Sequence, residues 1–179
     1  MIALLKPLKY FGCFLVLSLI IIQFFKPTKN LMASNLAMQK DISTLYKVPE
    51  QVNNLMQKAC YKCHSNNTVY PWYSNIQPVA WYVNNHVLDG KRHFNFNNFA
   101  SYNLRKQYHK LEEIKEQIAY NEMPLKAYTI IHGDAKLSDE DKLLITNWVD
   151  TVKAQMETQY PTDSFIQKKI SSCNFTVLM

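Results

Sequence analysis

The feature that most constrains the fold is the run Cys60-Tyr61-Lys62-Cys63-His64. The spacing C-x-x-C-H is the attachment signature of c-type haem. Two thiols must reach the two vinyl groups on one edge of the porphyrin, and the next residue must offer its imidazole to the iron. A short helical turn places all three side chains on one face. We therefore predict one covalently attached haem c, with thioethers at Cys60 and Cys63 and His64 as an axial iron ligand.

Two other uses of the same motif remain open as alternatives. A structural zinc site requires four ligands, and a second C-x-x-C or H-x-H motif usually supplies the ones that the first motif lacks. The remaining cysteines do not supply one, since Cys13 lies in a hydrophobic run and Cys173 lies far along the chain without an evident partner. A Cys–Cys redox pair or disulfide is the other alternative, but a thioredoxin-like pair wants a βαβ context that this sequence lacks.

Only 3 of the 179 residues are glycine. That scarcity excludes a Gly-rich phosphate loop, a doubly wound nucleotide-binding fold and a many-turned β-barrel. No convincing alternating strand occurs either, so the fold class is predicted as all-α. Together with the C-x-x-C-H motif, this predicts a small cytochrome c-like helical domain, and the apolar run near the N-terminus predicts a hydrophobic anchor helix before it.

Four helices are predicted from apolar spacing and end signals. They run from Pro49 into Cys60, from Pro78 to a C-cap at Gly90, over about 104–121, and onward from Ser138. Ser138 and Asp141 form an S-x-x-D capping box. The buried face of this last helix is predicted to hold Leu143, Leu144, Trp148, Val149 and Val152. The stretch 91–103 is expected to be irregular.

Residues 10–25 carry no charge and are almost wholly apolar. We interpret segment 1–29 as an uncleaved membrane anchor, with a signal peptide cleaved near Ser34 as the alternative. Under either interpretation the rest of the chain is exported. A linker at 30–45, a haem-binding domain at 46–152 and a C-terminal tail at 153–179 complete the expected organisation.

The net charge of +6 is concentrated at that first segment. Lys6, Lys9, Lys26 and Lys29 all lie within it, and the other 16 basic and 14 acidic residues leave a balance of only +2. A nucleic-acid-binding domain needs a basic face on its folded part. No run of that kind occurs, so nucleic acid is excluded as a partner.

The second axial ligand is predicted to be Met123, in the sequence Glu122-Met123-Pro124. It lies 59 residues beyond His64, just after a predicted helix, and Pro124 would stiffen the loop that holds the sulfur. His and Met together are an electron-transfer ligand set of raised potential. The alternatives are that Met123 packs in the core, that the iron is open, or that a histidine binds it: His86, His93, His109 or His132.

Three blocks extend the pattern beyond the five-residue motif: C-Y-K-C-H-S-N-N-T-V-Y-P-W-Y-S at 60–74, D-G-K-R-H-F-N-F at 89–96, and E-M-P-L-K-A-Y-T-I-I-H-G-D-A-K-L-S at 122–138. Together they resemble the bacterial haem-binding domain family, whose members are small exported cytochrome c-like domains common in Bacteroidetes. The resemblance covers about 46–152. It implies redox service but no defined substrate.

Further haem-pocket roles are expected for five residues. The Pro78 carbonyl is predicted to accept a hydrogen bond from the second ring nitrogen of His64. Contacts with the haem propionates are predicted for Trp72, Tyr73, Arg92 and His93. A packed aromatic cluster at 72–73 and a solvated turn at 91–92 are the structural alternatives.

The sequence therefore predicts an exported, membrane-tethered mono-haem protein on the periplasmic side of the bacterial inner membrane, which passes electrons between redox partner proteins. No catalytic residue is predicted. A peroxidase-like haem enzyme or a gas or redox sensor is the alternative if the distal site is open or His-ligated. A structural module whose haem only holds the fold together is a third interpretation.

Overall fold

The computed structural model describes residues 5–166, and within that range every regular element is helical. The α-helices are α1 (Leu5–Ile22), α2 (Ser34–Ala37), α3 (Glu50–Ala59), α4 (Val79–His93), α5 (Leu104–Ala119), α6 (Lys126–Ile131) and α7 (Asp139–Gln159). Short 3-10 turns join several of them. The predicted all-α class is confirmed, while Cys173 and the end of the predicted tail lie outside the described residues.

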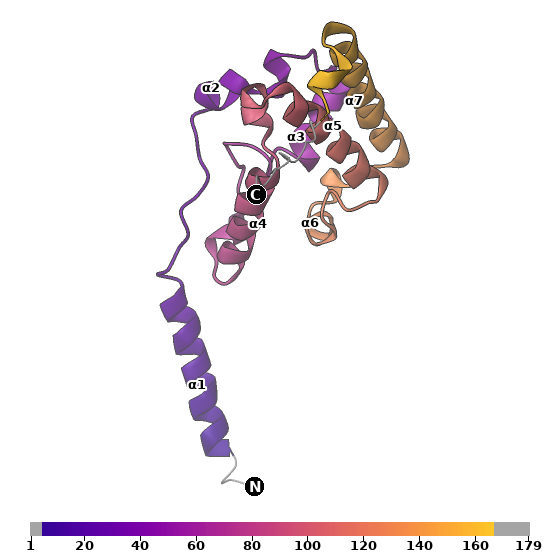
Figure 1. Ribbon diagram of the computed structural model, residues 1–179. Coiled ribbons are helices and arrows are strands. Elements are labelled where there is room, and N and C mark those ends of the chain that lie inside the picture. The colour runs from indigo at the N-terminus through magenta and orange to yellow at the C-terminus, as the bar shows by residue number, and fades with distance from the viewer. Residues whose placement is uncertain (1–4, 167–179) are drawn as a thin grey trace, which may run out of the picture.

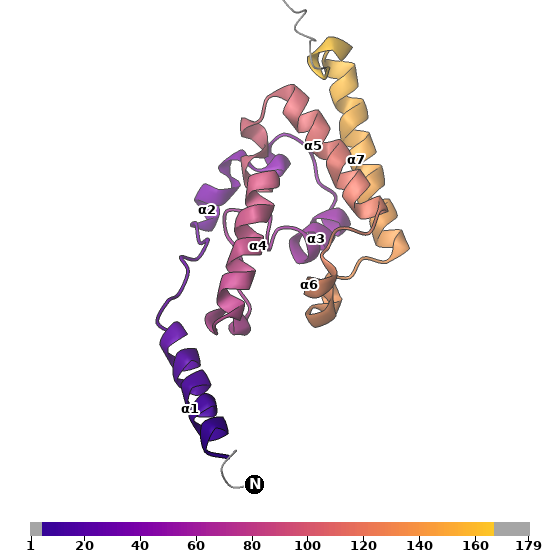
Figure 2. The same ribbon diagram turned by 60° about the horizontal axis from the view of Figure 1, so that its bottom comes forward.

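Helices α5 and α7 pack side by side, and α7 contributes more buried core residues than any other helix (Figures 1 and 2). Leu111 and Ile118 of α5 meet Ile145, Val149 and Met156 of α7, all fully or almost fully buried. Helix α3 packs on α7 through residues that include Val52 and Met56. This packing fixes the direction in which α3 delivers the Cys60–His64 motif.

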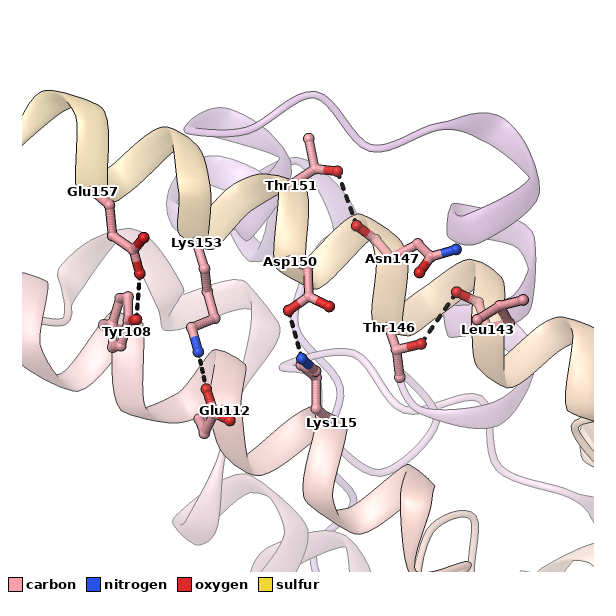
Figure 3. A network of polar contacts seen from close by, with 10 residues as sticks. All are labelled: Tyr108, Glu112, Lys115, Leu143, Thr146, Asn147, Asp150, Thr151, Lys153 and Glu157. Atoms are coloured by element: carbon pink, nitrogen blue, oxygen red, sulfur yellow. Dashed lines mark hydrogen bonds and ion pairs between the residues drawn. The ribbon is translucent and has the colours of Figure 1, made fainter.

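Polar contacts line the outer edge of the α5–α7 pair (Figure 3). Lys115 pairs with Asp150 at 2.5 Å, Tyr108 donates to Glu157 at 2.5 Å, and Lys153 pairs with Glu112. Because these groups are partly exposed, each pair adds little stability. The buried apolar side chains between the two helices are therefore the main source of their packing energy.

The start of α7 and the run of α3 into Cys60 agree with the sequence predictions. The end of α7 does not, because the helix continues to Gln159, inside the predicted tail at 153–179, and Met156 is buried there. Ser138 and Asp141 form the predicted capping box. Leu143 and Leu144, predicted to be buried, are 60% and 40% exposed, and Ile145 is buried in their place. The helical repeat explains this, because the spacing from Ile145 through Trp148, Val149 and Val152 keeps one face inward and turns 143 and 144 away.

Helix α4 also differs from its prediction. Gly90 lies inside the helix, which continues to His93, so it is not a C-cap. Part of the stretch predicted as irregular is likewise regular, since Phe96–Ser101 form a 3-10 helix. Helix α6 was not predicted, because its six residues are too few to show an apolar period.

The N-terminal helix α1 stands apart from the other helices in both ribbon views (Figures 1 and 2). Within residues 5–166, no helix is both apolar and long enough to cross a bilayer. The predicted anchor helix over 1–29 is therefore not found in the described chain. Helix α1 has 18 residues, with Lys6 and Lys9 in its first two turns, which leaves about 20 Å of uncharged helix against a hydrocarbon core of about 30 Å.

Residues 30–45, predicted to be a polar linker, pack on the haem-binding part of the chain. Helix α2 and the 3-10 turns Met38–Lys40 and Ile42–Thr44 lie here. Asp41 and Ile42 are fully buried, and Ala37 is nearly so. The segment is therefore part of the folded body and not a free tether.

Candidate haem-attachment site

Helix α3 ends on the cysteine motif and closes it into a compact turn. The Cys60 N–H donates to the Met56 carbonyl at 2.8 Å, and the N–H groups of Cys63 and His64 both donate to the Cys60 carbonyl, at 3.1 and 2.9 Å. Both cysteines are free thiols, half-buried. Burial raises the pKa of Cys60 to about 12 and also raises that of Cys63, so both thiols are protonated at neutral pH. The turn brings together the three residues that the motif predicts.

The imidazole of His64 is held in the tautomer that iron ligation needs. Its Nδ1 lies 3.0 Å from the Phe94 carbonyl oxygen, which can only accept, so Nδ1 carries the proton. Burial, the largest effect, lowers the pKa of His64 and keeps the ring neutral. The lone pair of Nε2 is consequently left for a metal. A backbone carbonyl bonded to the second ring nitrogen is the usual partner of a metal-binding histidine.

The orienting carbonyl was wrongly predicted. Pro78 lies at the start of α4, and its carbonyl accepts the N–H groups of Trp81 and Tyr82 instead. The Pro78 carbonyl is used by hydrogen bonds of the first turn of α4. Phe94 comes just after the last turn, and its carbonyl is free to accept from His64. A backbone carbonyl carries no side-chain signal, so the sequence could not point to Phe94.

Gly90 explains how α4 comes so close to the motif. A Cβ at this position would lie 3.3 Å from the Cys63 carbonyl oxygen, 3.4 Å from the Cys63 Cβ and 3.4 Å from Cε1 of His64. The contact with the Cys63 carbonyl oxygen would be tighter than nine in ten real Cβ contacts, and the other two would be at the edge of ordinary van der Waals contact. The absence of a side chain therefore lets the helix lie directly against the cysteine–histidine turn.

An aromatic group joins the 72–75 turn to α6 beside the cysteines. The Tyr73 hydroxyl and His132 Nε2 share a hydrogen bond of 2.6 Å, and His132 stacks on Tyr128 at a centroid distance of 4.5 Å. Lys62 lies 5.7 Å above the Tyr128 ring. Burial, the largest effect, raises the pKa of both Tyr73 and Tyr128. Tyr128 was missed by the sequence analysis.

The other predicted pocket residues are less closely connected to the motif. Trp72 meets Tyr73 edge-on but is 75% exposed. Arg92 forms an exposed ion pair with Asp89. His93 is exposed, yet its charge helps to lower the pKa of His64. Their contacts with haem propionates stay predictions.

Met123 lies in the connection between α5 and α6 and is half-buried. Asn121, at φ 57°, turns the chain out of α5. The N–H groups of Glu122 and Met123 then both donate to the Gln117 carbonyl, at 2.9 and 3.1 Å. Among the described hydrogen bonds and ring contacts, none joins Met123 to the motif, so its role as a ligand stays a prediction.

The segment directly after His64 is held by Asn30. Its side-chain Nδ2 donates to the Ser65 carbonyl at 2.9 Å and to the Thr68 hydroxyl at 2.8 Å, while its Oδ1 accepts from Lys91 of α4. Its backbone carbonyl accepts the Thr68 N–H at 3.0 Å, and its own N–H donates to the Tyr70 hydroxyl. A residue placed in the predicted linker thus makes hydrogen bonds that hold the loop after His64.

We expect Asn30→Ala to lower the free energy of unfolding by about 2 kcal/mol, because three side-chain hydrogen bonds with partly buried partners are lost. Urea unfolding followed by circular dichroism measures this. The matched control is Asn85→Ala, at an exposed position of α4, which should leave the midpoint nearly unchanged. Equal midpoints for the two variants would contradict the role given to Asn30.

The described part of the chain contains no cluster of histidines or carboxylates that could form a metal centre. In residues 5–166, no three or more His, Cys, Asp or Glu side chains are grouped so that they could hold a metal ion. The zinc alternative therefore has no four-ligand site in the part of the chain that the structure describes. The motif does fit haem, because it pairs two free thiols with one oriented, neutral imidazole.

Comparison with known proteins supports this assignment. No curated protein and no solved structure matches the chain. The model of the haem-binding domain family, in contrast, matches residues 17–151, about three quarters of the sequence. The match includes the cysteine–histidine turn, Asn30, Phe94 and Met123, and it confirms the resemblance seen in the sequence. The chain belongs to the haem-binding domain family.

Proposed function

We propose that this haem-binding domain holds one haem c covalently, through thioethers at Cys60 and Cys63, with His64 as the proximal ligand. The observation that carries the proposal is the hydrogen bond from His64 Nδ1 to the Phe94 carbonyl. It fixes the imidazole within the same turn as two free thiols. The close approach of α4 at Gly90 holds the turn from behind.

The proposed role is that of an electron carrier between redox partner proteins. When bound, haem with His and Met ligands exchanges single electrons at a raised potential. His64 supplies the imidazole, and Met123 is proposed to supply the thioether from the α5–α6 connection. The buried, rigidly bonded surroundings of His64 favour this role, because a ligand that moves little keeps the cost of reorganisation small.

An equilibrium redox titration with an absorption spectrum at each potential tests this role. We expect one reversible one-electron step and low-spin spectra in both oxidation states. A high-spin spectrum that responds to added carbon monoxide or peroxide would instead favour a haem enzyme or sensor. The Tyr73–His132 pair would then be the first polar group to examine, since His132 stacks on Tyr128, whose ring contacts Lys62 of the motif.

We also propose that the domain works on the periplasmic side of the bacterial inner membrane. Segment 1–29 would direct its export and keep it in contact with the membrane. The apolar side chains that α1 exposes, including Phe14, Val16 and Ile20, support this proposal. Asn30 supports retention of the segment in the mature protein, because cleavage near Ser34 would remove its hydrogen bonds to the loop after His64.

Protease added to spheroplasts tests the location. We expect it to degrade the domain while a cytoplasmic protein survives, and we expect purified protein to begin upstream of Asn30. Protection from the protease would contradict export. A mature chain that starts near Ser34 would contradict retention of the segment.

A further inference from the structure

A buried carboxylate lies behind the haem-attachment turn. Asp41 is fully buried, and its Oδ1 accepts from the Ser43 N–H at 2.9 Å and from the Ser43 hydroxyl at 2.7 Å. Asn97 Nδ2 donates to Oδ2 at 2.7 Å. The Tyr61 hydroxyl lies 3.1 and 3.0 Å from the two oxygens. Four donor groups thus converge on one carboxylate.

These contacts fit an ionised side chain. An ionised carboxylate only accepts hydrogen bonds, and here a backbone N–H, two hydroxyls and an amide are all able to donate. None of the ion pairs in residues 5–166 includes Asp41. Lys40, the neighbouring basic residue in the chain, is exposed. The negative charge is therefore stabilised by neutral dipoles and is not cancelled by a cation.

Tyr61 couples this charge to the motif, because it lies between Cys60 and Cys63 in the sequence. Its ring stacks on Phe96 at a centroid distance of 4.6 Å, and the Phe96 N–H donates to the His64 carbonyl at 2.9 Å. Burial first, and the negative charge of Asp41 second, raise the pKa of the Tyr61 phenol, so it stays a neutral donor. One tyrosine side chain separates the carboxylate from the backbone that carries the two cysteines.

Asn97 provides the second connection. Its side chain donates to Asp41 and accepts the Asn66 N–H at 2.7 Å. Asn95 bonds to both Asn97 and Asn66. Its Oδ1 accepts the Asn97 N–H, and its Nδ2 donates to the Asn66 side-chain oxygen. The carboxylate is thus tied to the chain on both sides of His64, through Tyr61 before it and Asn66 after it.

We propose that Asp41 is a positioning and tuning residue, whose fixed buried charge lowers the midpoint potential of the haem. The inference rests on the proposed electron-carrier function. A nearby anion favours the oxidised iron, which carries one more positive charge than the reduced iron. Water screens this charge poorly because the carboxylate is buried. The same charge on the surface would be largely screened.

The test is the midpoint potential of the purified holoprotein in three variants. Asp41→Asn removes the charge and keeps the shape, and Asp41→Ser removes it with a smaller side chain in case the amide disturbs the fold. We expect both to shift the potential upward, raising the ratio of reduced to oxidised protein at a fixed potential by on the order of fivefold. Glu50→Gln, which removes an exposed carboxylate from the first turn of α3, should leave it unchanged.

Tyr61→Phe distinguishes the effect of the Asp41 charge from the effect of the hydrogen bond that positions the cysteine–histidine turn. It removes one hydrogen-bond donor but keeps the carboxylate, so it should lower unfolding stability without raising the potential. A rise equal to that of Asp41→Asn would overturn the inference, because the loosened turn and not the charge would then be responsible. Unchanged potentials in both neutral Asp41 variants would overturn it as well. If wild-type protein shows no reversible redox step, the proposed function itself fails.

Discussion

Replacing Cys60 and Cys63 together by alanine is expected to abolish all haem that survives denaturing electrophoresis. The two thioethers are the only covalent bonds proposed between cofactor and chain, and both sulfurs come from the same turn after α3. Haem staining of the gel, normalised to total protein, measures the loss. We also expect a lower unfolding midpoint, since a bound cofactor stabilises the folded state by mass action.

The matched control is Cys13→Ala, which removes an exposed thiol from α1, far from the motif in the ribbon views (Figure 1). This variant should stain like the wild type. Haem stain that persists at the band of the double variant would show that attachment does not use this motif. Loss of stain in the Cys13 variant would instead point to a general failure of export or maturation.

Met123→Ala is expected to open the sixth coordination position. A thioether is a soft, neutral ligand for haem iron, and an alanine cannot replace it. The reduced variant should therefore become high-spin and bind carbon monoxide at least tenfold more tightly than the wild type. Met123→His should keep the iron six-coordinate and lower its potential. Spectroscopic titration with carbon monoxide measures the first effect and the redox titration the second.

A packing role for Met123 predicts a different result. The alanine variant would then lose about 2–5 kcal/mol of stability through a cavity and keep the wild-type spectrum. Met32→Ala, at an exposed position just before α2, is the control and should change neither property. If Met123→Ala binds carbon monoxide no better than the wild type, Met123 is a packing residue, and His93 is the next ligand to test.

The parts of the fold that the sequence predicted are those encoded by local signals. The capping box at Ser138 and Asp141 requires only neighbouring residues, and so does the helix that leads into Cys60. The family could be recognised because the cysteine–histidine motif and the blocks around it are contiguous in the sequence, whereas the ligand roles of the motif residues stay predictions. Local chemistry was enough in each of these cases.

The features that the sequence missed depend on contacts between distant segments. The hydrogen-bond partner of His64 is a backbone carbonyl 30 residues away. Every residue has a backbone carbonyl, so the residue type does not indicate which one is used. Asn30 and Asp41 looked like polar linker residues, because each has hydrogen-bond partners far along the chain: Ser65 for Asn30, and Tyr61 and Asn97 for Asp41. One signal was available: segment 30–45 holds several apolar residues, and two of them, Ala37 and Ile42, are buried.

Helix phase and helix ends were the other source of error. Leu143 and Leu144 are apolar, yet the turn of α7 that begins at Asp139 points them outward. Gly90 resembles a helix end, but its lack of a side chain serves the approach of α4 to Cys63. Composition cannot distinguish a glycine that ends a helix from one that permits close packing.

The central claim is that one haem is bound covalently at the cysteine–histidine turn. Mass spectrometry of the protein purified from a host with a haem-attachment system, recorded after denaturation and proteolysis, tests it most directly. We expect the peptide that contains Cys60 and Cys63 to carry the added mass of a single haem, while peptides with other cysteines carry none. A peptide at its unmodified mass, from protein that had bound haem before denaturation, would contradict the claim.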